Sequence, residues 1–405
     1  MERSSQPIEK QMISKVPEVT VLFWIIKVLC TTVGETFADF LNVNLNFGLT
    51  WTSVIMGALL IIALLFQFRA KKYVPGIYWI TVVFISVFGT LVTDNLTDRM
   101  GVPLETSTII FSILLLLTFA AWYTKEKTLS IHSIITPRRE IFYWLTILFT
   151  FALGTASGDL MAEALGLGYL VTGVIVAAVI IIVMIAEKFR LNPVLSFWII
   201  YIMTRPLGAS IGDLLSQPTK YGGLGLGATV TSVIFLLGIL VIVLFFTFTK
   251  HDVIENPVVE KIEDREGKGL IWQTVLTVVI FIVVGVSAYY WRQSVIRQEI
   301  NRPVSATNPG QNTSLSPLGD LSVFIKITQD IRDLVVAHDL PGAKTRSTDL
   351  EHEWDNAQSR LKPMNAAKWT EVDDAIDKVL RELRAVTPSE EGSKSALDAL
   401  ITILK

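Results

Sequence analysis

The chain has 405 residues, of which 51% are hydrophobic, and its mean hydropathy is +0.52. So much apolar surface cannot be hidden inside a soluble protein of this length, so the composition predicts an integral membrane protein. The formal net charge of −2 argues against a nucleic-acid partner, and the single cysteine, Cys30, allows neither a disulfide framework nor a cysteine-based metal site.

Apolar blocks long enough to cross a bilayer recur from the N-terminus to about residue 291. A helix needs about 20 apolar residues to cross the roughly 30 Å hydrocarbon core. The blocks lie at about 17–38, 51–68, 73–94, 105–123, 140–160, 168–187, 193–215, 228–249 and 269–291. The last one ends in Tyr289, Tyr290 and Trp291, which are typical of a membrane interface. The blocks predict an all-α integral membrane protein with nine transmembrane helices.

Basic residues predict the orientation of the chain. Lys and Arg gather after the second, fourth, sixth and eighth blocks, whereas the other loops contain only Arg99 and Lys220. The positive-inside rule then places the N-terminus in the cytoplasm and the C-terminus outside. The expected organisation is a cytoplasmic segment at 1–16, a membrane domain at 17–250, a cytoplasmic loop at 251–268, the ninth transmembrane helix at 269–291, a linker at 292–317 and an extracytoplasmic helical bundle at 318–405.

One spacing, W-x9-G-x4-D, occurs four times within the first eight blocks. The copies are Trp24–Gly34–Asp39, Trp79–Gly89–Asp94, Trp144–Gly154–Asp159 and Trp198–Gly208–Asp213. Each copy holds two blocks, so the chain returns to its starting side and all copies have the same orientation. We therefore predict four parallel two-helix repeats related by an axis along the membrane normal.

The spacing also predicts where the three repeated residues lie. The aspartate is expected near the outer end of its helix, and the tryptophan about 22 Å further down, as an anchor at the inner interface. The glycine is expected to allow close helix packing. The copies fall into two subtypes, because the first and fourth share FWII whereas the second and third share YW. We therefore expect unequal roles rather than a symmetric pore.

Four aspartates at one depth predict a cation site. A carboxylate inside a bilayer is costly and marks a pathway or a paired site. Four residues further on, copies two to four carry Asp98, Glu163 and Gln217, whereas copy one has Val43 next to Asn42. The predicted metal ligands are Asp39, Asp94, Asp159, Asp213, Glu35, Asp98 and Glu163. The predicted supporting polar residues are Thr36, Thr90, Thr155, Ser210, Asn42, Gln217, Thr52, Ser107, Thr172 and Thr231.

The chemistry of these ligands predicts the substrate. Carboxylate, amide and hydroxyl oxygens suit a hard divalent cation, with Mn²⁺ or Mg²⁺ favoured, and no histidine falls within a block. Clustered carboxylates repel one another unless they bind a cation or protons. We therefore expect a secondary transporter that exchanges a divalent cation for protons and has no tightly bound cofactor. The sequence shows no motif of an enzyme.

Two basic residues lie within predicted spans. Lys27 is expected to extend toward the cytoplasmic interface, as long amphipathic side chains do, or to serve with Arg205 in gating and ion pairing. Arg205, which precedes Pro206, is expected to pair with one of the acids and to act as a gate. If Arg205 instead binds the substrate, the chain would be a proton-coupled carrier of a small anionic or zwitterionic organic solute.

The four repeats resemble a known family. The strings WIIKVLCTTVGETFAD, WITVVFISVFGTLVTD, WLTILFTFALGTASGD and WIIYIMTRPLGASIGD resemble the repeat of unknown function DUF347, over about residues 17–250. The resemblance implies a multi-pass protein of the bacterial inner (plasma) membrane. It implies no activity, so the functional argument rests on the residues.

The C-terminal region, 318–405, is water-soluble in composition and has helical periodicity, which predicts a small antiparallel helical bundle. Its acidic run from Asp349 to Asp355 is expected to be a solvated face rather than a metal site. A further alternative for the whole chain is a membrane scaffold or sensor whose spans present this bundle to an extracytoplasmic partner. The oligomeric state does not follow from the sequence.

Overall fold

The computed structural model describes residues 14–44, 47–217, 223–253, 269–300, 316–362, 364–385 and 387–405. Within these ranges the chain forms 13 α-helices and no strand. Nine of the helices are long and apolar enough to cross a membrane, which confirms the predicted fold. Most of the predicted N-terminal segment and most of the 251–268 loop lie outside the described residues.

The helices of the repeats follow the predicted blocks closely. They are α1 Val21–Asp39, α2 Gly48–Arg69, α3 Pro75–Asp94, α4 Leu104–Glu126, α5 Pro137–Asp159, α6 Tyr169–Lys188, α7 Pro193–Ser216 and α8 Gly227–Thr249. Pro75, Pro137 and Pro193 each start a helix, where the missing backbone N–H would have no intrahelical partner. Short turns are η1 Phe40–Asn44, η2 Asn95–Arg99, η3 Ile131–Ser133 and η4 Leu160–Ala164.

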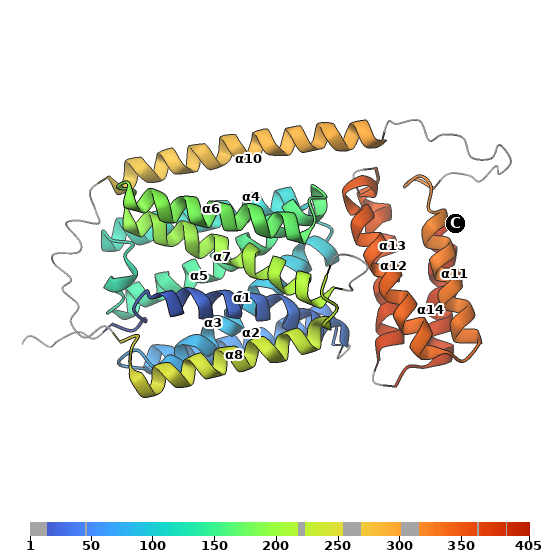
Figure 1. The fold of residues 1–405 in the computed structure, drawn as a ribbon, viewed down its shortest axis with the longest axis horizontal. Helices are drawn as coiled ribbons and strands as arrows, with labels where there is room; N and C mark the ends of the chain where they lie inside the picture. The colour runs from blue at the N-terminus through green and yellow to red at the C-terminus, as the bar shows by residue number, and fades with distance from the viewer. Residues whose placement is uncertain are drawn as a thin grey trace, which may run out of the picture.

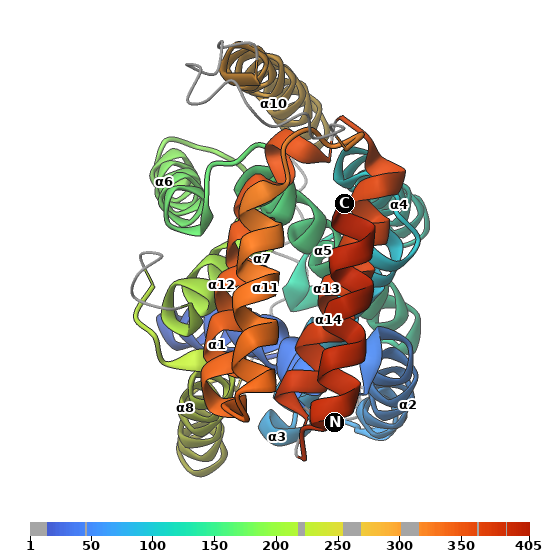
Figure 2. The same ribbon diagram turned by 90° about the vertical axis from the view of Figure 1, so that its right-hand side faces the viewer.

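The first helix of each repeat lies at the centre of the membrane domain. Helix α1 packs against α3 and α7, and α5 packs against the same two helices, so the four form a closed ring. The second helix of each copy packs on the outside against the first helix of the next copy, and α8 closes the circle on α1 (Figure 2). Because α2, α4, α6 and α8 face outward, they are apolar nearly all round.

The glycine of each repeat brings neighbouring ring helices into close contact. A Cβ atom added to any of the four would lie 1.9 to 2.8 Å from the nearest side-chain atom of the next copy, too close for a real side chain. The contact residue always lies three positions before the glycine of its own copy; the pairs are Gly34 with Ser86, Gly89 with Phe151, Gly154 with Arg205, and Gly208 with Thr31. The predicted packing role of the glycines is confirmed.

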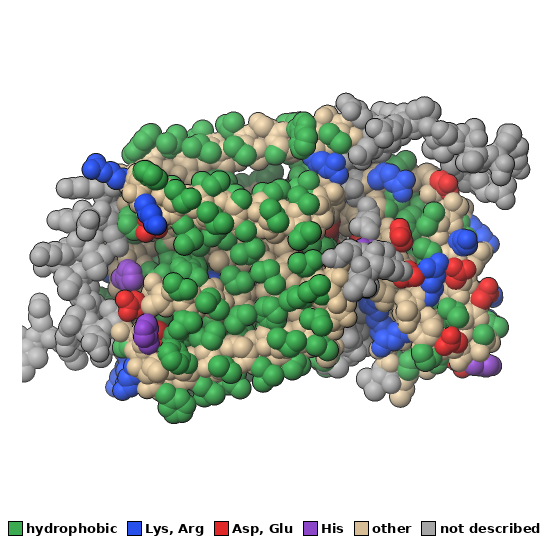
Figure 3. Space-filling model, viewed as in Figure 1, with side chains coloured by type: hydrophobic (Ala, Val, Ile, Leu, Met, Phe, Trp, Pro, Cys, Tyr) green, Lys and Arg blue, Asp and Glu red, His purple; other side chains and the backbone are tan. Residues whose placement is uncertain are grey.

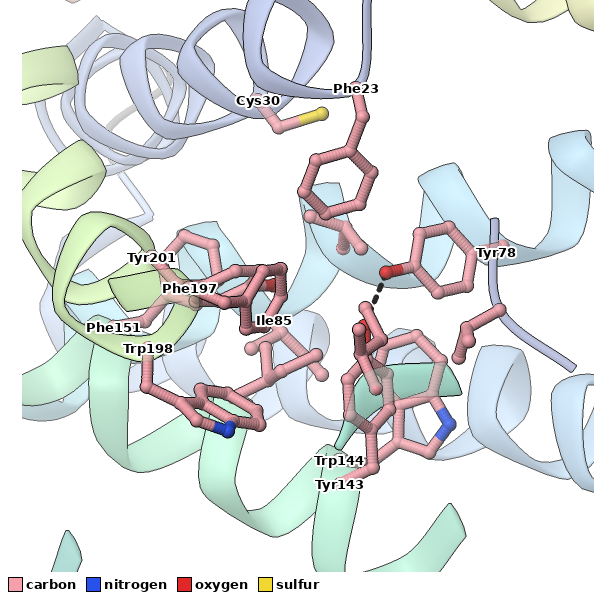
Figure 4. Packing of buried hydrophobic residues seen from close by; sticks show 14 of the residues in the cluster. Phe23, Cys30, Tyr78, Ile85, Tyr143, Trp144, Phe151, Phe197, Trp198 and Tyr201 are labelled. Carbon is pink, nitrogen blue, oxygen red and sulfur yellow. Dashed lines mark hydrogen bonds between the residues drawn. The ribbon is translucent and has the colours of Figure 1, made fainter. Parts of the chain in front are cut away.

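Three of the four repeat tryptophans lie inside the ring rather than at an interface, and the fourth, Trp24, is half-buried. Trp79, Trp144 and Trp198 are only 1%, 3% and 3% exposed, so the prediction of interfacial anchors is wrong for them. Their rings pack with a set of tyrosines and phenylalanines, and the hydroxyls of Tyr78 and Tyr143 are 2.5 Å apart (Figure 4). We call this the aromatic end of the membrane domain. The opposite end, where the repeat aspartates lie, is the acidic end.

The ninth membrane helix, α10 Leu270–Ile300, runs along one side of the ring (Figure 1). It continues beyond residue 292, where the sequence predicted a linker; residues 301–315 lie outside the described part of the chain. Near the acidic end, Arg292 Nε donates to the Leu165 carbonyl at 2.5 Å, and Tyr289 donates to Glu105 at 3.2 Å. Hydrophobic side chains cover the flank of the membrane domain, as contact with lipid requires (Figure 3).

The C-terminal region forms the predicted helical bundle. Its helices are α11 Ser322–Val336, α12 Leu340–Leu361, α13 Ala366–Arg384 and α14 Glu390–Leu404, which we call the tail bundle. Trp354 and Trp369 stack in its core with ring centroids 3.9 Å apart. Helix α12 contacts η4, and α13 contacts η1 and η2, so the tail bundle lies against the acidic end (Figure 1). The sequence did not predict this contact.

Candidate cation site

The repeat aspartates lie where their helices end. Asp39, Asp94 and Asp159 are each the last α-helical residue before a π-helical turn, and Asp213 lies in the last turn of α7. The C-terminal end of a helix carries partial negative charge. Ionised carboxylates are therefore unfavourably placed with respect to their own helices, and a nearby cation or bound protons would relieve this.

Three carboxylates form one tight group. Glu35, Asp39 and Asp213 each offer an oxygen within 4.8 Å of the others, and no other group of three such metal-ligating side chains occurs in the described ranges. Glu35 and Asp213 are partly buried, whereas Asp39 is exposed. We call this group the carboxylate triad. It contains two of the four repeat aspartates, those of copies one and four, which are neighbours in the ring.

The other predicted ligands lie at the same end but outside the triad. Asp94 and Asp159 are partly buried at the ends of α3 and α5. Asp98 is exposed in η2, and Glu163 in η4 accepts a hydrogen bond from Tyr169 at 2.8 Å. The structure therefore brings three of the seven predicted ligands into one group, and the convergence of all four repeat aspartates is only partial.

A buried arginine supplies positive charge beside the triad. Arg205 is 1% exposed, and its Nη2 donates to Glu35 Oε2 at 2.5 Å and to Thr90 Oγ1 at 2.6 Å. Its Nε and Nη1 have no hydrogen-bond partner among the described residues. The expected pairing of Arg205 with an acid is present in the structure, and its role as a gate stays a prediction. A charge-assisted contact of this kind stabilises both partners.

The second buried cation, Lys27, is held between two aromatic rings. Its Nζ lies 4.0 Å from the ring centroid of Phe151 and 4.1 Å from that of Tyr201. The side chain is 1% exposed, so the expected extension toward the cytoplasm is wrong. The rings replace water by cation–π attraction, which helps to hold an ammonium group that has no hydrogen-bond acceptor within the described residues.

The predicted supporting side chains are spread over the membrane domain, and only Thr90 and Thr36 make a side-chain hydrogen bond to the side chain of another helix in the described residues. Thr90 contacts Arg205, but Thr36 accepts from Ser232 of α8 at 2.8 Å and Thr155 donates to the Phe151 carbonyl at 3.1 Å. The remaining members are buried or half-buried at other places in the membrane domain; these are Ser210, Asn42, Gln217, Thr52, Ser107, Thr172 and Thr231. Thr52, Ser107 and Thr172 have no hydrogen-bond partner in the part of the chain described.

The tail bundle adds charged residues that sequence reasoning had not connected with the site. The guanidinium of Arg384 makes two hydrogen bonds to the Glu351 carboxylate, at 3.0 and 2.5 Å, and its charge also acts on Asp39. Helix α12, which carries Glu351 and Asp355, contacts η4, the turn that holds Glu163. Part of the run predicted to be a solvated face therefore faces the membrane domain.

The fold and the charged centre define a class of protein: a multi-pass helical membrane protein with four parallel two-helix repeats around a central ring. The repeats match the family model Repeat of Unknown Function (DUF347) at residues 22–73, 77–128, 142–190 and 196–252, which is just over half of the chain. The chain belongs to this family. Neither the search of curated proteins nor that of solved structures finds a match.

Proposed function

We propose that the protein is a secondary transporter for a hard divalent cation, with Mn²⁺ or Mg²⁺ as the first candidates, and that transport is coupled to protons. The observation that carries this proposal is the carboxylate triad of Glu35, Asp39 and Asp213 beside a buried Arg205. Carboxylate oxygens are the ligands that hard divalent cations prefer. In this proposal the cation is the substrate, and the triad is its binding site.

The charges of the site support an exchange of one cation for two protons. Three ionised carboxylates and one guanidinium leave two negative charges, which one divalent cation neutralises. Two bound protons do the same when the cation leaves, because like-charged carboxylates at short range favour protonation. Glu35, held by Arg205 in the structure, is the ligand that the cation competes for, so Arg205 acts as a stand-in cation in the empty state.

The aromatic end supports a transport cycle with access from one side at a time. Below the triad the ring is filled by packed aromatic side chains, and the chain closes over this end through Lys15–Glu140 at 2.6 Å and Tyr73–Asp252 at 2.5 Å. Passage through this end requires the packed rings to separate. Parallel repeats support such a movement, because packed units can shift against one another around a fixed site.

The positive-inside pattern supports a cytoplasmic aromatic end and an extracytoplasmic acidic end with the tail bundle outside. The family resemblance supports the bacterial inner membrane as the location. In this orientation the triad binds its cation from the outer side and discharges it when the aromatic end opens.

One observation favours a second candidate. Arg205 Nε and Nη1 are buried without partners in the described chain, and buried donors are usually satisfied. A substrate carboxylate or phosphate would satisfy them, which supports a proton-coupled carrier of a small organic anion. The scaffold or sensor alternative predicts neither cation nor solute binding.

Thermal unfolding with added metal tests the proposal. Mn²⁺ or Mg²⁺ at 100 times its Kd should stabilise the purified protein by about 2.7 kcal/mol. Asp39→Asn should abolish this shift, whereas the matched control Asp333→Asn, on the exposed side of α11, should keep it. An unchanged melting curve at millimolar metal, or an equal shift in both variants, would exclude the triad as the cation site.

The remaining repeat aspartates give a separate test by flux. We expect Asp94→Asn and Asp159→Asn to abolish cation uptake into proteoliposomes while the protein still inserts, because both carboxylates lie at the acidic end through which the cation passes. Near-normal uptake in both variants would exclude them from the pathway.

A further inference from the structure

The tail bundle rests on the acidic end through two of its helices. Helix α12 contacts η4, whereas α13 contacts η1 and η2, the turns that follow Asp39 and Asp94 (Figure 2). The contact is close at Gly101, where an added Cβ would lie 3.6 Å from Thr370 Oγ1 of α13. The tail bundle therefore covers the end of the ring that carries the carboxylate triad.

The two surfaces that meet here have the same sign of charge. Acidic side chains come from α12, α13 and the membrane domain; they are Glu351, Asp355, Asp373, Asp374, Asp377, Asp39, Asp98 and Glu163. Basic side chains among them are Lys362, Arg381 and Arg384. Acids outnumber bases, so with all of them ionised the two surfaces repel one another.

Two carboxyls of α13, those of Asp373 and Asp377, have raised pKa values. Burial raises the pKa of Asp377 to about 7, with Asp98 of the membrane domain adding to the rise and Arg381 opposing it. Burial also raises the pKa of Asp373 well above its usual range, and the negative charges of Asp377 and Asp98 raise it further. The Trp354 indole donates to Asp373 Oδ1 at 2.8 Å, so this carboxyl is fixed to the core of the tail bundle.

We propose that the tail bundle is a reversible cap on the acidic end, which docks when the carboxyls of Asp373 and Asp377 on α13 are protonated and lifts off when they ionise. Docking places α13 against η1 and η2, the turns that follow Asp39 and Asp94, so the cap lies over the approach to the triad. The inference concerns the position of the tail bundle and does not depend on which substrate the ring carries.

The direction of the pH effect follows from proton linkage. A carboxyl whose pKa is higher in the docked state binds a proton more tightly there, so its contribution to docking is complete at low pH. That contribution is lost as the pH rises through the docked pKa. For Asp377, whose pKa in the docked state is about 7, the docked fraction should therefore fall between about pH 5.5 and about pH 8.5.

A distance measurement between the two parts tests the proposal. We would replace Cys30 with Ser, and place spin labels at Leu224→Cys on the membrane domain and Lys394→Cys on α14, both exposed positions. The full-length protein in lipid nanodiscs with EDTA should give one narrow, short distance at about pH 5.5. At about pH 8.5 a longer, broad distribution should replace it.

Two variants separate carboxyl protonation from other effects of pH. In Asp373→Asn/Asp377→Asn the amides cannot ionise but can still accept the Trp354 hydrogen bond, so the short distance should persist at both pH values. Asp333→Asn, on the exposed side of α11, should behave like the parent. A parent distance that does not change with pH, or a double variant that still releases the tail bundle at high pH, would overturn the proposal.

Discussion

The contact between Gly208 and helix α1 allows the closure of the ring to be tested by a single methyl group. In Gly208→Ala the new Cβ would lie 2.0 Å from Thr31 Oγ1 and 2.9 Å from the backbone nitrogen of Thr32. A flexible side chain can move away from such a contact, but a helix backbone cannot. Helices α1 and α7 therefore have to separate.

The cost of that separation follows from two effects. Overpacking of a well-packed interior costs about 1–3 kcal/mol. Separation also lengthens the hydrogen bonds from Thr31 Oγ1 to the Thr204 carbonyl and from Thr32 Oγ1 to the Gly208 carbonyl, each 3.0 Å long. Bonds of this type between membrane helices contribute about 0.6 kcal/mol each. We expect Gly208→Ala to lower the free energy of unfolding by about 2–4 kcal/mol.

Unfolding by titration with a denaturing detergent measures this loss, with Gly285→Ala in α10 as the matched control. No atom lies within 4 Å of a Cβ built at Gly285, so there the better helix propensity of alanine should leave stability equal or raise it by up to about 1 kcal/mol. If Gly208→Ala were as stable as Gly285→Ala, the close crossing of α1 and α7 would be refuted.

Two further substitutions probe the buried cations. Glu35→Ala should destabilise the protein by about 3–5 kcal/mol, because the substitution leaves the guanidinium of Arg205 buried with Thr90 as its remaining partner. The same detergent titration measures this loss of stability. Lys27→Met should leave stability equal or higher in that titration, since a thioether fits between the rings of Phe151 and Tyr201 without a charge to desolvate; a large loss would show that the ammonium itself stabilises the ring.

The sequence predicted those features that repeat with a fixed spacing. The W-x9-G-x4-D pattern predicted the four parallel repeats, the close packing at their glycines and the gathering of the aspartates at one end. The two subtypes also indicated an asymmetric site. Phe23 and Phe197 of copies one and four pack together with ring centroids 6.1 Å apart, whereas Tyr78 and Tyr143 of copies two and three share a hydrogen bond.

Features that depend on which copies become neighbours could not be predicted. Lys27 belongs to copy one, whereas the rings around it come from copies three and four, so its surroundings follow only from the closed ring. The triad joins copies one and four for the same reason. Burial of the tryptophans follows from the ring too, because a tryptophan near a helix end fits an interface and a core equally well.

The contact of the tail bundle with the membrane domain was beyond sequence reasoning for a different reason. The two surfaces that meet are both acidic, and opposite charges are the usual sequence sign of docking. Asp98 and Asp377 are far apart in the chain and lie in elements of different composition. Their proximity depends on the folded positions of both parts.

Cation flux into proteoliposomes with an imposed proton gradient tests the central claim most directly. With an acidic interior, the parent protein should accumulate Mn²⁺ or Mg²⁺ with saturation and release about two protons per cation, the number needed to balance its charge. Asp213→Asn should lose this accumulation while Asp333→Asn keeps it. Absence of cation flux in the parent, or equal flux in Asp213→Asn, would contradict the account.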